Sequence, residues 1–256
     1  MNILSDLQSR HREGKRSLAV LIDPDKAEDL NSLRQLIRLA NENCIDLILV
    51  GGSLVLTNNL SEIIAQIREE VNIPVVLFPG SPLQITPGAD GILLLSLISG
   101  RNPDLLIGHH VQAAPLLKNL GMEVLPTGYI LINSGKITSV AYVSNTTPIP
   151  DDKYALAACT AMAGEMLGLK LLYLDAGSGA EKEISAKMIN AVRRSVSVPI
   201  IVGGGINSPE KAEIALQAGA DVIVIGNVLE KEPVALTAIA EKVYEWNTQR
   251  RMMPNH

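Results

Sequence analysis

Short apolar segments that end in glycine or in polar turn residues recur along the whole chain, and they constrain its fold more than any other feature. They are apolar without interruption, which is typical of strands buried on both faces in a parallel sheet covered by helices. Eight such segments occur: Leu18–Ile22, Leu47–Val50, Val75–Phe78, Ile92–Leu95, Glu123–Asn133, Leu171–Leu174, Pro199–Val202 and Val222–Ile225. We therefore predict a parallel sheet of eight strands.

Amphipathic stretches of helical period separate these segments. They are Ala27–Asn43, Ser61–Val71, Asp104–Leu120, Asp152–Leu167, Ile184–Ser195, Pro209–Ala218 and Pro233–Trp246. Strand and helix alternate along all 256 residues without a linker, at the usual size of a (β/α)8 TIM barrel. We expect one TIM-barrel domain over 1–256, with an open doubly wound sheet as the alternative.

Two segments break the alternation. Pro79–Gly91 lies between the third and fourth strands and holds prolines at 79, 82 and 87 with glycines at 80 and 88, so it cannot form a packed helix. We expect a modified barrel that lacks its third outer helix, with either a covering loop or an open groove in its place. Ser134–Asn145 is turn-rich and β-branched, and we expect a small hairpin there.

Glycine turns follow the last three strands. They are Gly177-Ser178-Gly179, Gly203-Gly204-Gly205 and Gly226-Asn227. Glycine allows a ligand to approach the backbone, and the loops after strands seven and eight bind phosphate in many TIM barrels. Such turns also occur without a ligand, but three in succession favour a phosphate site. The pattern lacks the third glycine of a dinucleotide fingerprint.

Polar residues at two other strand ends have two interpretations each. Asp23, Asp25 and Ser53 offer the oxygen ligands that Mg²⁺ prefers, or Asp23-Pro24-Asp25 is only a turn that caps a helix. Tyr173 and Asp175 lie two residues apart on the sixth strand and share a face. Asp175 is a candidate general base, or else a helix cap beside a core tyrosine.

Composition excludes several classes of function. The chain is 47% hydrophobic, which excludes a disordered protein, and its net charge of -5 argues against nucleic-acid binding. No apolar run is long enough to span a membrane. Cys44 and Cys159 are interpreted as reduced core residues of a cytosolic protein. The adjacent His109 and His110 are interpreted as structural.

Several motifs occur together in a fixed order. They are Leu21-Ile22-Asp23-Pro24-Asp25-Lys26, Gly51-Gly52-Ser53, Pro126-Thr127-Gly128-Tyr129, Tyr173-Leu174-Asp175-Ala176-Gly177-Ser178-Gly179-Ala180, Gly203-Gly204-Gly205-Ile206 and Gly226-Asn227. Over nearly its whole length the chain resembles the geranylgeranylglyceryl phosphate synthases. The resemblance implies a modified barrel without its third helix and a cytoplasmic prenyltransferase of ether-lipid biosynthesis. Such an enzyme joins sn-glycerol 1-phosphate to geranylgeranyl diphosphate and releases pyrophosphate.

The resemblance also implies roles for residues. Asp23 and Ser53 would bind Mg²⁺, and Asp175, with Tyr173, would be catalytic. Glycerol 1-phosphate would contact Tyr173, Leu174, Asp175, Ala176, Gly177, Ser178, Gly179, Gly204, Gly205, Gly226 and Asn227. The family usually has Glu where this chain has Asp175. We expect the prenyl tail to lie where the third helix is missing, against Val75, Leu77, Phe78, Leu93, Leu95 and Tyr129.

Other functions remain open from the sequence. A heptaprenylglyceryl phosphate synthase would use the same chemistry with a longer donor. A phosphate-handling barrel isomerase or lyase would share the glycine turns without a lipid groove, and a silent barrel would bind a phosphorylated ligand without turnover. We expect a homo-oligomer, dimer or hexamer, with transient contact to a membrane surface at most.

Overall fold

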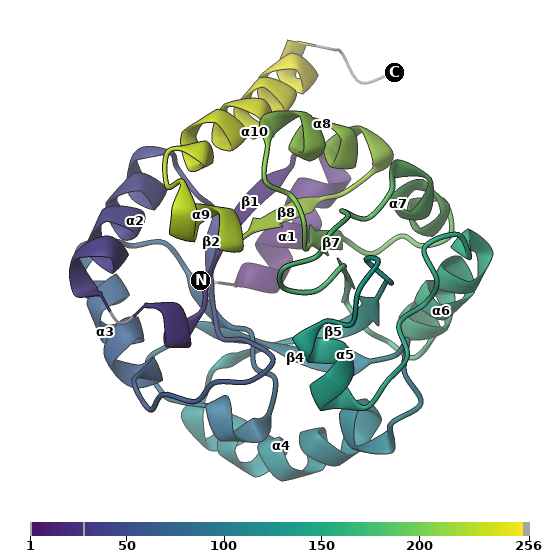
Figure 1. The fold of residues 1–256 in the computed structure, drawn as a ribbon, viewed down its shortest axis with the longest axis horizontal. Helices are drawn as coiled ribbons and strands as arrows, with labels where there is room; N and C mark the ends of the chain where they lie inside the picture. The colour runs from purple at the N-terminus through teal and green to yellow at the C-terminus, as the bar shows by residue number, and fades with distance from the viewer. Residues whose placement is uncertain (1, 28, 253–256) are drawn as a thin grey trace.

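Eight parallel strands close into a barrel in the computed structural model, which describes residues 2–27 and 29–252. The strands are β1 (Ser17–Ile22), β2 (Leu47–Val50), β3 (Val75–Leu77), β4 (Gly91–Leu97), β5 (Glu123–Leu131), β6 (Leu171–Asp175), β7 (Ile200–Gly203) and β8 (Val222–Ile225). They pair in chain order, and β8 pairs with β1, as at Ser17 and Val222. Figure 1 shows the strands at the centre of a ring of helices. The predicted TIM barrel is confirmed, and the open sheet is wrong.

Helices follow most strands. The α-helices are α1 (Ile3–Arg12), α2 (Leu30–Glu42), α3 (Leu60–Glu70), α4 (His109–Leu120), α5 (Ser139–Ser144), α6 (Tyr154–Met166), α7 (Ala186–Arg193), α8 (Pro209–Ala218), α9 (Asn227–Lys231) and α10 (Ala235–Met252). Ser208 caps α8 by accepting a hydrogen bond from the Lys211 amide, and Pro209 is its first residue. Glu28, inside the helix expected from Ala27, lies outside the described residues.

The third outer helix is absent, as predicted. Between β3 and β4 the described chain has only the 3₁₀ turn η2 (Pro82–Gln84). The buried side chain of Gln84 fixes this segment, because its amide donates to the Gly52 carbonyl (3.1 Å) and accepts from the Gly80 amide (3.0 Å). The replacement loop is therefore tied to the loop after β2.

Side chains alternate along each strand between two hydrophobic cores. One set fills the barrel, as Leu49, Val76 and Tyr173 do. The other set faces the surrounding helices, as Val75 and Leu77 do beside the α3 residues. The uninterrupted apolar segments of the sequence arise because both faces of each strand are covered.

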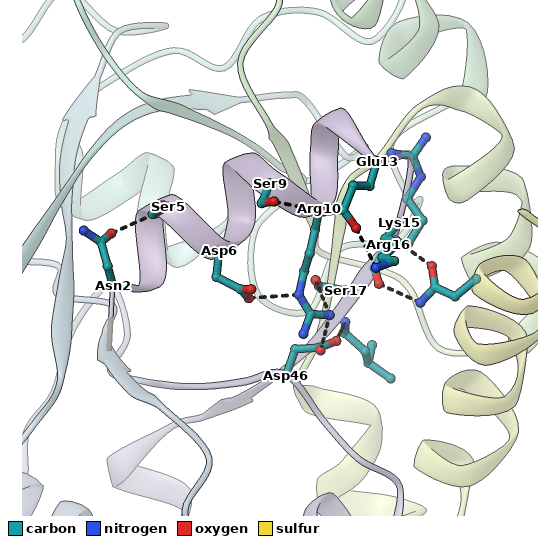
Figure 2. Close-up of polar contacts among 12 residues, drawn as sticks. Asn2, Ser5, Asp6, Ser9, Arg10, Glu13, Lys15, Arg16, Ser17 and Asp46 are labelled. Atoms are coloured by element: carbon teal, nitrogen blue, oxygen red, sulfur yellow. Dashed lines mark hydrogen bonds and ion pairs between the residues drawn. The ribbon is translucent and has the colours of Figure 1, made fainter. Parts of the chain in front are cut away.

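Helix α1 closes the N-terminal end of the barrel. Its Ile3 and Leu7 belong to the core inside the barrel, and the Glu123 carboxylate accepts hydrogen bonds from the Ile3 (2.7 Å) and Leu4 (2.8 Å) amides. Figure 2 shows Arg10 of α1 bound to Asp6 and Asp46. The opposite end of the barrel, where the strands terminate, stays available for a site.

Two local predictions are wrong. The segment after β5 contains the short helix α5 instead of a hairpin, since the Thr138 carbonyl accepts from the Tyr142 amide in a helical turn. Cys44 and Cys159 are free but exposed, not in the core, because each lies on the outer side of its connection or helix. Across the described residues, no helix combines the length and apolarity that crossing a bilayer requires.

Candidate functional site

Asp175 is the central polar residue at the C-terminal end of the barrel. Its side chain is buried, with 7% exposed. The Tyr129 hydroxyl donates a hydrogen bond to Oδ2, and the Gly177 amide donates one to Oδ1 at 2.8 Å. No lysine, arginine or histidine in the described part of the chain forms an ion pair with it. Asp175 is therefore a buried carboxylate held by neutral donors only.

Burial is the main influence on the pKa values of Asp175 and Tyr129. It raises the pKa of Asp175 above the usual aspartate value, although the Tyr129 hydroxyl and the Gly177 amide act in the opposite direction. Burial, together with the neighbouring Asp175 charge, raises the pKa of the Tyr129 phenol well above its usual value. Tyr129 therefore stays protonated and donates, while Asp175 is a stronger base than an exposed aspartate.

Three aromatic rings lie beneath the site. Tyr173 stacks on Phe78, with centroids 5.2 Å apart and planes at 10°, and Tyr129 lies 5.5 Å from Tyr173. A Cβ on Gly203 would lie 2.3 Å from the Tyr173 hydroxyl oxygen, so only glycine leaves room for the phenol. Tyr173 and Asp175 do share a face, as the strand spacing predicts, and that face points into the barrel.

The glycine turns after β6, β7 and β8 lie together. Gly177, Gly179, Gly204 and Gly205 all have positive φ. The Asn227 amide nitrogen donates to the Ser178 hydroxyl at 3.0 Å, and Lys26 donates to the Asn227 amide oxygen at 3.2 Å. These bonds connect the turns after β1, β6 and β8 into one polar surface.

Two members of the predicted glycerol phosphate set turn away from this surface. Leu174 and Ala176 are fully buried in the core between the barrel and the helices. They alternate with Tyr173 and Asp175, so only their backbone atoms face the site. Gly226 begins the turn before Asn227 and packs against Leu21.

Asp23 lies beside the β8 turn, because β1 pairs with β8 and the Lys26 ammonium reaches both Asp23 and Asn227. Ser53 lies on the loop after the neighbouring strand β2. Asp23 Oδ1 accepts the Asp25 amide (3.2 Å), and its Oδ2 lies 3.5 Å from the Lys26 ammonium. A Cβ on Gly52, next to Ser53, would be 3.8 Å from Asp23 Oδ1, so the two loops touch. A partly exposed carboxylate on one loop and a hydroxyl on the loop that touches it fit Mg²⁺, which takes one or two carboxylates, several waters and substrate phosphate oxygens.

The sequence offers Asp25 as a possible Mg²⁺ ligand, but in the structure its carboxylate is bonded to the loop after β2. Its carboxylate accepts hydrogen bonds from the Leu56 amide (2.9 Å) and from the amide (2.9 Å) and hydroxyl (2.7 Å) of Thr57. These bonds lower the pKa of Asp25. Asp25 thus holds the loop after β2 in place. The described residues contain no cluster of three His, Cys, Asp or Glu side chains suited to a metal.

An apolar cavity of about 590 Å³ opens beside the barrel where the third helix is missing. It runs from Gly52 and Ser53 at the mouth, past Phe78, to Ala113 on α4. Ile92 and Leu94 line it because the absent helix leaves the outer face of β4 uncovered. The size falls within the roughly 300–1,000 Å³ of small-molecule sites.

Three of the six residues expected to contact the prenyl tail line this cavity. Phe78, Leu95 and Tyr129 do so. Val75 and Leu77 do not, because they point outward against helix α3, and Leu93 points into the closed interior of the barrel. Val75 and Leu77 are excluded because alternating residues of a strand face opposite sides. Leu93 shares the inward face of Leu95 but lies two residues nearer the closed N-terminal end of the barrel.

Sequence reasoning missed some residues of the site. His109 and His110 line the cavity, and His110 Nε2 lies 3.3 Å from the Ser96 hydroxyl. Burial lowers the pKa of His110, which favours its neutral form. The hydrogen bond from Tyr129 to Asp175 was also missed, because it joins residues 46 positions apart. The only sequence signal for it is that both residues lie on neighbouring strands.

The fold places the chain among the TIM barrels, and its glycine turns are typical of those that bind phosphorylated ligands. Within that class the chain belongs to the PcrB family, whose model matches residues 10–243. The geranylgeranylglyceryl phosphate synthase of Spirosoma linguale is 56% identical over 96% of this chain and 98% of the relative. That of Chitinophaga pinensis is 52% identical, over 94% and 96%.

A solved structure is similar over the same range. It is the (S)-3-O-geranylgeranylglyceryl phosphate synthase of Thermoplasma acidophilum in complex with its substrate sn-glycerol-1-phosphate. The two chains share 33% identity with a TM-score of 0.89, covering 96% of this chain and 99% of the other. The family expected from the motifs is therefore confirmed.

Proposed function

We propose that this protein is a Mg²⁺-dependent prenyltransferase that joins geranylgeranyl diphosphate to sn-glycerol 1-phosphate. Two relatives that match this chain over nearly their whole length, at 52% and 56% identity, are named geranylgeranylglyceryl phosphate synthase. The observation that carries the proposal is the position of Asp175, a buried carboxylate between the glycine turns and the Tyr129 side of the apolar cavity. It lies where a polar acceptor and an apolar donor would meet.

The reaction needs a base that takes the proton of the acceptor hydroxyl and a surface that stabilises positive charge on the allylic donor. The bond between C1 of the allylic donor and its diphosphate oxygen breaks, and pyrophosphate leaves with the electron pair. The 3-hydroxyl oxygen of glycerol phosphate bonds to C1, and Asp175 takes its proton. The rings of Phe78 and Tyr129 line the cavity beside this point, and aromatic faces stabilise a nearby positive charge.

The acceptor and the donor would occupy different sides of the mouth. The turns containing Gly177–Gly179, Gly204–Gly205 and Gly226–Asn227 would hold the acceptor phosphate through backbone amides. The donor tail would lie in the cavity against Phe78, Leu95 and Tyr129. Asp23 and Ser53 would hold Mg²⁺, which when bound neutralises charge on the leaving diphosphate.

The setting of the reaction follows from its substrates. We propose a cytoplasmic homo-oligomer, dimer or hexamer, that contacts the bilayer transiently, since its product is a lipid. Exposed apolar side chains near the cavity, among them Leu54 (55%) and Leu83 (96%), would suit this contact.

A product assay tests the proposal directly. Purified protein is mixed with radiolabelled sn-glycerol 1-phosphate, Mg²⁺ and farnesyl, geranylgeranyl or heptaprenyl diphosphate, and label is measured in an organic extract. We expect label with the geranylgeranyl donor, loss of label with a chelator and recovery when Mg²⁺ returns. Preference for the heptaprenyl donor would assign the longer-chain synthase. No label with any donor would overturn the proposal and leave the isomerase, lyase and silent-binder functions.

A further inference from the structure

The loop after β5, residues 133–138, lies along the loop after β6. A Cβ on Gly135 would be 3.1 Å from a Glu181 carboxylate oxygen, and one on Gly179 would be 3.7 Å from the Lys136 ammonium. A Cβ on Gly177 would be 2.9 Å from the Thr138 hydroxyl oxygen. These contacts run in opposite directions along the two segments, so the β5 loop covers the turn expected to bind phosphate.

Thr138 has an unsatisfied hydroxyl at this junction. Its side chain is only 5% exposed, and its Oγ1 has no hydrogen-bond partner among the described residues. Ser134, in the same loop and 2% exposed, also has a buried unpartnered Oγ. A buried hydroxyl without a partner is costly, and such groups are rare in folded proteins. The Thr138 side chain packs against Gly177, with its methyl carbon 2.7 Å and its hydroxyl oxygen 2.9 Å from the position of a Cβ there.

Lys136 brings a positive charge to the same turn. Its side chain is exposed, and no acidic side chain in the described part of the chain pairs with it. Lys211, near the β7 turn, is already engaged by Glu183 (3.1 Å) and the Gly205 carbonyl (3.4 Å). Lys136 is thus a cation available above Gly179, where backbone amides alone would otherwise face an anion.

We propose that the β5 loop completes the phosphate site. The Lys136 ammonium pairs with the phosphate of the acceptor, and the Thr138 hydroxyl donates a hydrogen bond to the same ligand. The ligand class is a small polyol phosphomonoester, and this identification rests on the proposed function. Lys136 and Thr138 bind and position the acceptor and take no part in the proton transfer to Asp175.

Calorimetric titration of sn-glycerol 1-phosphate into Lys136→Met tests the charge. We expect about tenfold weaker binding at low salt, because a hydrogen bond to a charged group is lost, and a smaller difference at high salt. Lys136→Arg should keep most of the affinity. The matched control is Lys187→Met, which makes the same charge change on the exposed side of α7. Equal affinity of Lys136→Met and wild type at low salt would overturn the role of Lys136.

Thr138→Val tests the hydroxyl with little change of shape. We expect the KM for glycerol 1-phosphate to rise several-fold, with the KM for the prenyl donor unchanged and the melting temperature not lowered, since the hydroxyl has no partner within the protein. An unchanged acceptor KM, or equal increases in both KM values, would overturn the role of Thr138.

Inorganic phosphate as a second probe separates this inference from the proposed function. Phosphate binding that depends on Lys136, in a protein that makes no ether product, would overturn the function and support the phosphate site. Ether synthesis with a normal acceptor KM in Lys136→Met would support the function and overturn this inference.

Discussion

Two buried aspartates lie at opposite ends of the barrel, and their surroundings differ in kind. Asp221, at the N-terminal end and 3% exposed, accepts hydrogen bonds from His11 (2.9 Å), Arg16 and Arg193 (2.9 Å), and from the Ile200 amide (2.8 Å). Asp175, at the C-terminal end, has only a phenol and one backbone amide. Burial is similar, but only Asp221 has its charge compensated.

The difference separates a structural carboxylate from a reactive one. Asp221 joins the α1 end, β1, β7 and α7, and Arg16 also lies over the Trp246 ring (5.4 Å), which ties in α10. Arg16 and Arg193 compensate the negative charge of Asp221, so its role is to hold these elements together. Burial disfavours the charged form of Asp175 and raises its pKa, so this carboxylate has a greater tendency to take a proton from a substrate.

Asp175→Asn should have the largest effect. We expect kcat/KM to fall by about 10²–10⁴-fold because the amide cannot act as a base, while the unfolding free energy at neutral pH does not fall. Product formation and urea unfolding measure the two quantities. Asp175→Glu is the matched control and should keep substantial activity, since the family usually has Glu there. Full activity in Asp175→Asn would remove the distinction between the two carboxylates.

Asp221→Asn should instead lower stability and leave activity nearly unchanged. We expect the unfolding free energy to fall by about 3 kcal/mol, because buried cations lose their charged partner. The kcat/KM of the remaining folded protein should stay within about twofold at temperatures well below the transition, since energetic coupling extends little beyond residues in contact. Urea unfolding and the product assay at 20 °C check this. A stable but inactive Asp221→Asn would contradict a structural role.

A third change tests whether the C-terminal end is built to hold an apolar chain. Ala113 is a small residue of α4 that lines the cavity. Ala113→Phe should fill part of the cavity and shift donor preference from geranylgeranyl towards farnesyl or geranyl diphosphate by about tenfold. Leu116→Phe, on the exposed side of the same helix, is the control. Unchanged donor preference would place the tail elsewhere.

The barrel and its missing helix could be predicted from the sequence because both are local patterns. Uninterrupted apolar segments reveal buried strands, and the prolines of Pro79–Gly91 exclude a helix whatever surrounds them. The glycine turns were visible for the same reason. Strand ends predicted to within two residues then place Asp175, Gly204 and Asn227 at one end of the barrel.

Contacts between distant segments could not be predicted. The Tyr129–Asp175 hydrogen bond depends on the register of β5 with β6, in which Leu131 pairs with Asp175. Helix α5 was missed because its six residues are too few for a helical period, and its β-branched composition favours a strand. The contact of Lys136 with Gly179 depends on how two loops pack, which no local pattern encodes.

Tyr129→Phe gives the smallest effect and tests the neutral donors of Asp175. Removing the phenolic donor should raise the pKa of Asp175 further, because that hydrogen bond favours the ionised carboxylate. Activity needs ionised Asp175, so kcat/KM should rise with pH through this pKa. The acidic limb of the profile should lie above the ordinary aspartate range in wild type and higher still in Tyr129→Phe.

The free energy of unfolding should also depend on pH, in the direction that the raised pKa of Asp175 sets. A raised folded-state pKa means that the folded protein binds the proton more tightly than the unfolded chain. The stabilisation from this group is therefore complete below the ordinary aspartate pKa of 3.8 and is lost as pH rises through the folded-state pKa. In Tyr129→Phe the loss should extend to higher pH. Tyr244→Phe, on the exposed side of α10, should change neither curve. A limb that stays in place in Tyr129→Phe would mean that burial alone, without the phenol, sets the proton affinity of Asp175.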